Sequence, residues 1–160
     1  MSGRSYNIDT FTKRLDQLTN GELKKEMSKW LASIGFQLLK EVQREIMQTG
    51  SIDTRKLLHS FEKGNTENVW QISRGGLTLE VGTKVEYAGL VNDGHWQEKR
   101  FVPGVWKGER FIYDRNAKTG MMLKAKWIKG THYWDAAVSI MEHTLENSFE
   151  RLMQRFLDQL

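Results

Sequence analysis

A pair of short alternating segments between two long helical patterns is the feature that most constrains this chain of 160 residues. Residues 69–73 and 77–81 alternate apolar with polar side chains, which is the period-two pattern of half-buried β-strands. Gly75-Gly76 stands between them, and glycine tolerates the positive φ angles of tight hairpin turns. The pattern therefore predicts a β-hairpin, followed by a short segment at 87–95 that carries its own aromatic anchor.

Two long helical patterns flank this hairpin. Apolar side chains recur every three or four positions in residues 23–46, which predicts a helix of about 28 residues, or about 40 Å at 1.5 Å per residue. Residues 19–22 match a capping box, and Gly50 is the expected C-terminal glycine cap. A fresh cap at 51–53 precedes a short helix at 54–61, and the last helix begins within 131–135. The predicted contacts between the long helices join Trp30, Ile34 and Leu38 to Val138, Met141 and Leu145.

A second hairpin is expected between the first one and the last helix. Residues 109–114 and 121–128 each suit a strand, and residues 115–120 have the composition of a turn. Pro103 is the only proline, and with nearby glycines it predicts that regular structure is interrupted across 98–108.

The order of these elements indicates an α+β fold. We expect long N-terminal and C-terminal helices packed on an antiparallel β-sheet, with an extended β-hairpin arm. At this length one domain, residues 1–160, is the natural expectation. Within it, residues 1–18 form an N-terminal arm and short helix, and residues 97–128 form an inserted loop and hairpin.

Composition excludes several classes of protein. The chain has no cysteine, so a disulfide framework and a thiolate metal site are both excluded. No apolar run approaches the roughly 20 residues that span a membrane, and the first residues lack the apolar core of a signal peptide. We expect a protein that is made in the cytoplasm and has no membrane partner.

Charge is unevenly distributed along the chain. Residues 96–132 hold nine lysines and arginines against three acidic residues, although the whole chain has a net charge of only +4. A basic segment on a near-neutral body indicates an acidic partner surface or nucleic acid. A solvated, flexible loop is the remaining alternative.

Aromatic and other apolar side chains lie among these basic residues. Such a mixture can stack on nucleic-acid bases, but tryptophan, tyrosine and arginine also dominate protein–protein interfaces. We favour a protein contact, with a nucleic-acid-binding module that uses the basic aromatic hairpin 97–128 as the alternative. The predicted subunit or partner interface consists of Trp96, Arg100, Phe101, Trp106, Phe111, Tyr113, Met121, Met122 and Trp127.

Signals of catalysis are weak. The sequence contains no nucleophile elbow, phosphate-binding loop or dinucleotide fingerprint. Asp93 and His95, with His132 and Asp135, have suitable donor atoms for a transition metal, but an Asp-x-His string in a turn is a weak signal. We therefore expect no catalytic residues, no metal site and no cofactor.

Two short strings resemble the signature of a known family. Residues 49–61 resemble the "T-G-x-L … S-F" string of the tail-completion proteins of tailed bacteriophages and phage-tail-like particles. Residues 85–95 resemble the "V-x-Y-A-x-x-V-E-x-G" signature that follows the hairpin in this family, with Asn92 where an acid is usual. This is the head–tail joining family named after gene product ten of a lambdoid coliphage, and the resemblance covers residues 20–160. The residues that match the motif are Gly50, Leu57, Ser60, Phe61, Tyr87, Ala88, Val91 and Gly94.

The resemblance implies a non-enzymatic structural protein. Proteins of this family form rings, commonly homohexamers, at the head-proximal end of the tail, as tail completion, tail terminator or neck proteins. The implied partners are other copies of the chain, the tail tube or sheath and the neck or connector proteins, with DNA touched only in the ring lumen. The implied location is the virion or a phage-tail-like particle, assembled in the bacterial host cytoplasm. A ring needs a heterologous interface that closes, and we expect segment 97–128 to supply it.

Overall fold

The computed structural model describes residue 13, residues 21–50 and residues 55–158 of the chain. These residues form two compact units. The helical unit runs up to Ala88 and resumes at Tyr133, and the strand unit is Gly89–His132. Apart from Lys13, the predicted arm and short helix of residues 1–18 lie outside the described residues, as does the predicted cap at 51–53.

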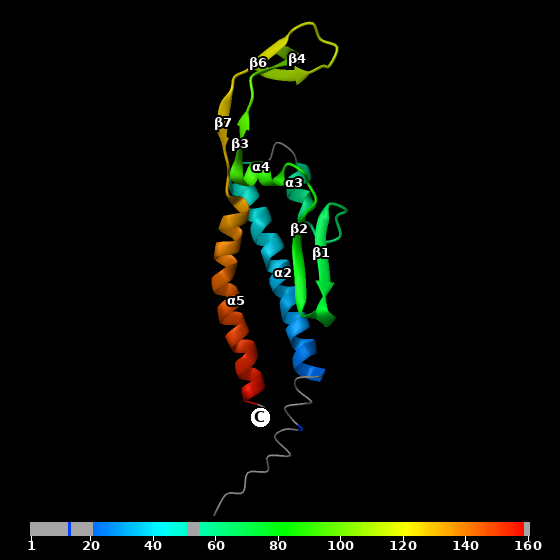
Figure 1. Ribbon diagram of the computed structural model, residues 1–160, viewed down its shortest axis with the longest axis vertical. Coiled ribbons are helices and arrows are strands. Elements are labelled where there is room, and N and C mark those ends of the chain that lie inside the picture. The colour runs from blue at the N-terminus through cyan, green and yellow to red at the C-terminus, as the bar shows by residue number, and fades with distance from the viewer. Residues whose placement is uncertain (1–12, 14–20, 51–54, 159–160) are drawn as a thin grey trace, which may run out of the picture. The chain divides into compact units, whose positions relative to one another are not determined.

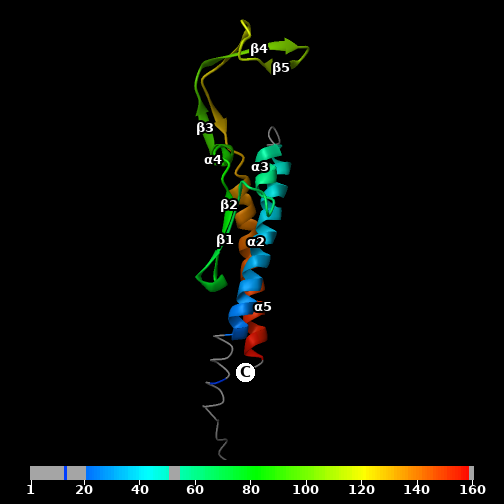
Figure 2. The ribbon, with the colours of Figure 1, turned by 90° about the vertical axis from the view of Figure 1, so that its right-hand side faces the viewer.

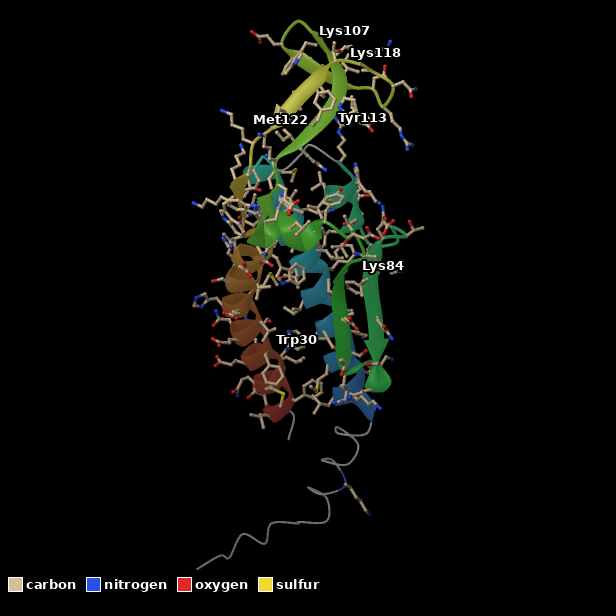
Figure 3. All side chains as sticks on the ribbon, turned by 45° about the horizontal axis from the view of Figure 1, so that its top comes forward. Trp30, Lys84, Lys107, Tyr113, Lys118 and Met122 are labelled. Carbon is tan, nitrogen blue, oxygen red and sulfur yellow. The ribbon has the colours of Figure 1, made fainter. Side chains whose placement is uncertain are left out.

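Two long helices form the core of the helical unit. They lie side by side and run in opposite directions, since the C-terminal end of α5 lies beside the start of α2 (Figure 1). Trp30 of α2 donates a hydrogen bond through Nε1 to Ser148 Oγ of α5 over 3.0 Å, and its ring centroid lies 5.3 Å from that of Phe149. Figure 3 shows Trp30 projecting from α2 toward α5. The helices of this unit are α2 (Leu23–Gln48), α3 (Arg55–Ser60) and α5 (Tyr133–Leu157).

Helix α2 ends as predicted, whereas its start differs from the prediction. Thr49 is the C-cap, and Gly50 follows with a φ of 67°, the left-handed conformation that glycine adopts readily. At the other end, Glu22 occupies the N-cap position and makes no side-chain cap hydrogen bond. Thr19, the other half of the predicted capping box, lies outside the described residues.

The buried row of α2 agrees with the predicted stripe at Ile34, Val42 and Ile46 and differs from it at one position. Leu39 is 3% exposed, whereas Leu38, which was predicted to be in the core, is only half-buried. Helix α2 packs on a hairpin and on α3 as well as on α5, which widens its buried face. The buried residues of α2 are Ile34, Gly35, Leu39, Val42 and Ile46.

The first turns of helix α5 differ from the prediction, because the buried residues there lie one position earlier than Trp134 and Val138. Tyr133 and Ala137 are buried, and the Tyr133 ring packs at 6.1 Å from the ring of Phe61. Met141 is buried as predicted, but Leu145 is 41% exposed and Phe149 is 37% exposed. One edge of the predicted apolar stripe of α5 is therefore at the surface.

The first hairpin forms as predicted. Strands β1 (Asn68–Ser73) and β2 (Thr78–Thr83) pair antiparallel, with Trp70 opposite Val81 and Ile72 opposite Leu79. The turn is the short helix η2 (Arg74–Gly76), in which both glycines have positive φ. The hairpin lies along one side of the helix pair (Figure 2), close to Gly35, where a Cβ atom would meet Leu79 Cδ2 at 2.3 Å.

The strand unit differs from the prediction in its pairing. Its elements are α4 (Ala88–Asp93, whose first residue belongs to the helical unit), β3 (Gly94–Gln97), β4 (Arg100–Lys107), β5 (Arg110–Tyr113), β6 (Gly120–Leu123) and β7 (Lys126–Lys129). The predicted hairpin between 109–114 and 121–128 is wrong, because β5 and β6 both pair with β4 and not with each other. Strand β7 pairs instead with β3, far away in the sequence. The α+β class is confirmed, and the strands of the described residues form three separate antiparallel sheets.

Pro103 lies inside β4, where the sequence predicted irregular structure. The first half of β4 pairs with β6 and the second half with β5, and Pro103 is the last residue of the first half. Its carbonyl accepts from Asp114 N at 3.3 Å, while the next amide, Gly104 N, donates to Thr119 O at 2.9 Å. The missing N–H of proline therefore falls where the strand changes its partner, a position in which a sheet tolerates proline.

Candidate interaction surface

Four of the residues that match the family motif are part of the core of the helical unit. Leu57, Ser60 and Phe61 are at most 1% exposed, and Ala88 is also buried. The Phe61 ring lies against the rings of Tyr133 and Trp134, with both pairs of centroids 6.1 Å apart. These motif residues thus join α3 to the start of α5, which is a structural role.

Ser60 is the centre of a buried hydrogen-bond network. Its Oγ donates to Leu57 O and accepts from Thr83 Oγ1, each over 2.7 Å. Its backbone carbonyl accepts from Asn68 Nδ2 at 3.1 Å, and Thr83 Oγ1 accepts from Val85 N at 3.1 Å. Because Ser60 is fully buried, this network ties α3 to both strands of the first hairpin.

Two further motif residues, Val91 and Gly94, hold the chain where it enters and leaves the strand unit. Val91 O accepts from Thr131 N at 2.9 Å, and Asn92 O accepts from His132 N at 3.0 Å. Gly94 has a φ of 85°, and a Cβ atom there would lie 2.6 Å from Ile128 O. A side chain at position 94 would therefore block this reversal.

The predicted interface residues are mostly exposed. Trp96, Phe101, Trp106, Tyr113, Met122 and Trp127 are between 52% and 63% exposed. Arg100 is exposed as well, whereas Phe111 and Met121 are half-buried. All nine lie in the strand unit, where Figure 3 labels Tyr113 and Met122. Their role in an interface remains a prediction.

The register of β5-β4-β6 distributes its side chains over two faces, because residues directly opposite each other share a face and neighbours along a strand alternate. Face one consists of Phe101, Pro103, Val105, Lys107, Arg110, Ile112, Gly120 and Met122. Face two consists of Arg100, Val102, Gly104, Trp106, Phe111, Tyr113, Met121 and Leu123. Both faces carry large exposed apolar side chains, an arrangement that is uncommon on a surface facing water.

Two glycines let aromatic rings lie flat on this ladder. A Cβ atom at Gly104 would come within 2.5 Å of the Phe111 ring, and one at Gly120 within 2.6 Å of the Phe101 ring. The rings cover the glycines on face two and face one respectively, and the Phe111 ring also packs edge-on against Trp106 at 5.2 Å. These contacts fix the aromatic side chains on the ladder, so that the exposed surface is preorganised.

The second ladder of the strand unit presents a tryptophan pair. Trp96 of β3 lies directly opposite Trp127 of β7, and both are more than half exposed. Residues directly opposite in an antiparallel ladder share a face, so the two indoles belong to one surface.

The strand unit is strongly basic. It contains nine lysines and arginines against four acidic residues, a net charge of +5, while the chain as a whole has +4. Lys107 and Arg110 lie directly opposite each other at one end of face one, although like charges in that relation are unfavourable. Neither forms an ion pair with any of the described residues. An acidic partner would relieve this repulsion.

Neither a cluster of metal-binding side chains nor a membrane-spanning helix is found in the described part of the chain. Among the described residues, no three histidine, cysteine, aspartate or glutamate side chains lie close enough together to hold a metal ion. Within the same part of the chain, no helix is long and apolar enough to cross a membrane.

A shallow cavity of about 280 Å³ lies between the start of α2 and the end of α5. It is lined by residues of both charges, including Glu26 and Arg155. A hydrogen bond from Lys29 Nζ at 2.7 Å lowers the pKa of the Glu26 carboxyl, but this pair is an exposed contact along one helix. The cavity contains no arrangement of acid, base and nucleophile.

Sequence reasoning missed part of the exposed apolar surface. Val105 and Ile112 of face one, both more than a third exposed, were expected among the apolar side chains of segment 97–128 that need a partner, but they were not part of the predicted interface set. Apolar residues stand next to each other at 101–102 and at 105–106, so the sequence carried no period-two signal that assigned them to faces. Leu145 and Phe149 were assigned to the core because the stripe of α5 gives no indication of which edge faces outward.

Comparison with known proteins gives a consistent result. Residues 9–94 match the family described as "Bacteriophage HK97-gp10, putative tail-component". The chain is 48% identical over 149 residues to the "Phage-like element PBSX protein XkdI" of Bacillus subtilis (strain 168), covering 91% of this chain and 92% of that protein. It is 43% identical over 158 residues to the "Uncharacterized protein YqbI" of the same organism, covering 94% and 95% of the two chains. No solved structure matches.

Proposed function

This chain belongs to the HK97-gp10-like family of bacteriophage tail components, and on that premise we propose that it forms a ring at the head-proximal end of a tail. In this role it is a tail completion, tail terminator or neck protein without catalytic activity. A tail component works by contact with other proteins of the particle. The relative named for a phage-like element supports a phage or a phage-tail-like particle as the setting.

The observation that carries the proposal is the exposed apolar surface of the strand unit. Six of its large apolar side chains are more than half exposed, and they occupy both faces of the β5-β4-β6 ladder and the tryptophan pair. Surfaces of this kind mark sites of protein–protein contact, and exposed tryptophan and tyrosine are frequent hot spots. A ring uses two different surfaces of each copy, so the interface must be heterologous and must close.

The proposal is tested by deletion of the gene from a strain that makes the particles. We expect tails without their head-proximal ring, and antibody against the protein should label one end of wild-type tails in electron micrographs. Complementation with the full chain should restore both properties. Normal tails from the deletion strain, or label distributed along the tail, would refute the proposed role.

A variant chain separates the strand unit from the rest. Replacing residues 104–126 by a short Gly-Ser linker removes the three-stranded ladder and leaves the core of the helical unit untouched. We expect this variant to fold but to fail to form rings or to complement. Circular dichroism of the purified variant provides the control for folding.

Nucleic-acid binding through the strand unit is the second candidate function. The exposed aromatic side chains and the net charge of +5 of this unit favour it. A salt titration of DNA binding distinguishes the two functions. Submicromolar binding at physiological salt with a steep salt dependence would support nucleic-acid binding, whereas weak binding lost by about 200 mM salt would support protein contact.

A further inference from the structure

Helix α5 exposes a surface whose chemistry complements the strand unit. Glu142, Glu146 and Glu150 are exposed and follow one another at intervals of four residues, so they form a row along one side of the helix. None of them forms an ion pair with another described residue. Leu145 and Phe149, two of the exposed apolar residues of α5, lie next to this acidic row.

Face one of the β5-β4-β6 ladder has the matching properties. Its apolar part includes Phe101 and Met122, both more than half exposed, and its basic end is the Lys107–Arg110 pair. On α5, apolar side chains lie beside an acidic row. On face one, apolar side chains lie beside a basic pair. The charges of the two surfaces are opposite in sign, and this complementarity gives an interface its specificity.

We infer that face one of one copy packs on the exposed side of α5 of a second copy. The inference rests on the proposed ring, for which it names the two surfaces. The basic pair then contacts Glu142 and Glu146, and the apolar side chains of the ladder cover Leu145 and Phe149. Because the two surfaces differ, every copy presents face one to one neighbour and the exposed side of α5 to the other, as a closed ring requires.

Exchange of the charges tests this pairing. The first variant carries Glu142→Lys and Glu146→Lys, and the second carries Lys107→Glu and Arg110→Glu. Each variant alone places like charges across every interface, and we expect its dissociation constant for assembly to rise about 100-fold or more above that of the wild type. An equimolar mixture restores opposite charges at every contact when the two variants alternate, so the mixture should assemble. Native mass spectrometry should then find equal numbers of the two variants in each ring.

A control variant carries Arg115→Glu and Lys118→Glu, the same change of charge in the loop between β5 and β6, which lies outside face one. We expect it to assemble like the wild type. Circular dichroism checks the helix content of each variant, and recovery in the mixture is itself evidence that both chains are folded.

Several outcomes would overturn the inference. Wild-type rings that persist in either charge variant, or variants that stay apart when mixed, would show that these surfaces do not meet between copies, while the proposed ring would stand. If the variant with Lys107→Glu and Arg110→Glu still assembles but loses DNA binding, face one binds nucleic acid and not a second copy, and the inference is overturned. A wild-type chain that is monomeric and absent from the particles would refute both the inference and the proposed function.

Discussion

The adjacent residues Leu38 and Leu39 of α2 offer a direct test of how the helical unit is packed. Leu39 is 3% exposed and Leu38 is half-buried, so Leu→Ala at the two positions makes the same chemical change in different surroundings. At Leu39 the substitution removes three buried carbon groups, which lowers the free energy of unfolding by about 2.4 kcal/mol at about 0.8 kcal/mol for each group. The cavity left behind raises this loss to about 3–4 kcal/mol. At Leu38 the cost should be about 1 kcal/mol, because part of the side chain already contacts water.

Urea denaturation followed by circular dichroism at one fixed protein concentration measures both losses, since any assembly makes stability depend on concentration. The change in helix propensity is the same at both positions and cancels in the comparison. In thermal scans Leu39→Ala should melt lower than Leu38→Ala by about 2–4 °C for each kcal/mol that separates them. Equal losses, or a larger loss at Leu38, would mean that the buried row of α2 is the one predicted from the sequence and that the packing described above is wrong.

Two further predictions concern the residues that match the family motif. Ser60→Ala should destabilise the helical unit by about 1–3 kcal/mol in urea denaturation, because the Thr83 hydroxyl loses its buried acceptor. The control Ser139→Ala, on the exposed side of α5, should be nearly neutral, and equal losses of stability in the two variants would show that the network does not stabilise the unit. Gly94→Ala should speed amide hydrogen exchange throughout β3 and β7, because Gly94 has a φ of 85° and a Cβ atom there would collide with the backbone. The control Gly89→Ala, whose Cβ atom would have no neighbour within 4 Å, should leave exchange unchanged, and slow exchange retained in Gly94→Ala would refute the predicted strain.

The helical unit could be predicted well because its signals are local. The helix of residues 23–46, its end at Gly50 and the hairpin around Gly75-Gly76 all follow from periodicity and turn residues that lie close together in the sequence. What periodicity could not decide was the exact side of each helix that is buried. That depends on which elements pack around it, and α2 has three such neighbours.

The strand unit could be predicted only in part, because its pairings are non-local. Strand β7 pairs with β3 across more than twenty intervening residues, and no local pattern distinguishes that partner from the nearer β5. Pro103 was taken as a break because proline is rare inside a sheet, but β4 changes its partner at that residue. The exposed aromatic surface was expected from composition, since so many apolar residues in a basic segment need a partner.

The most direct test of the account is a cryo-electron microscopy reconstruction of the assembly formed by the purified full-length chain. We expect closed rings in which residues 100–123 of each subunit lie on residues 142–149 of its neighbour. A protein that stays monomeric at about 100 µM, or rings in which the strand unit contacts no other subunit, would contradict the account.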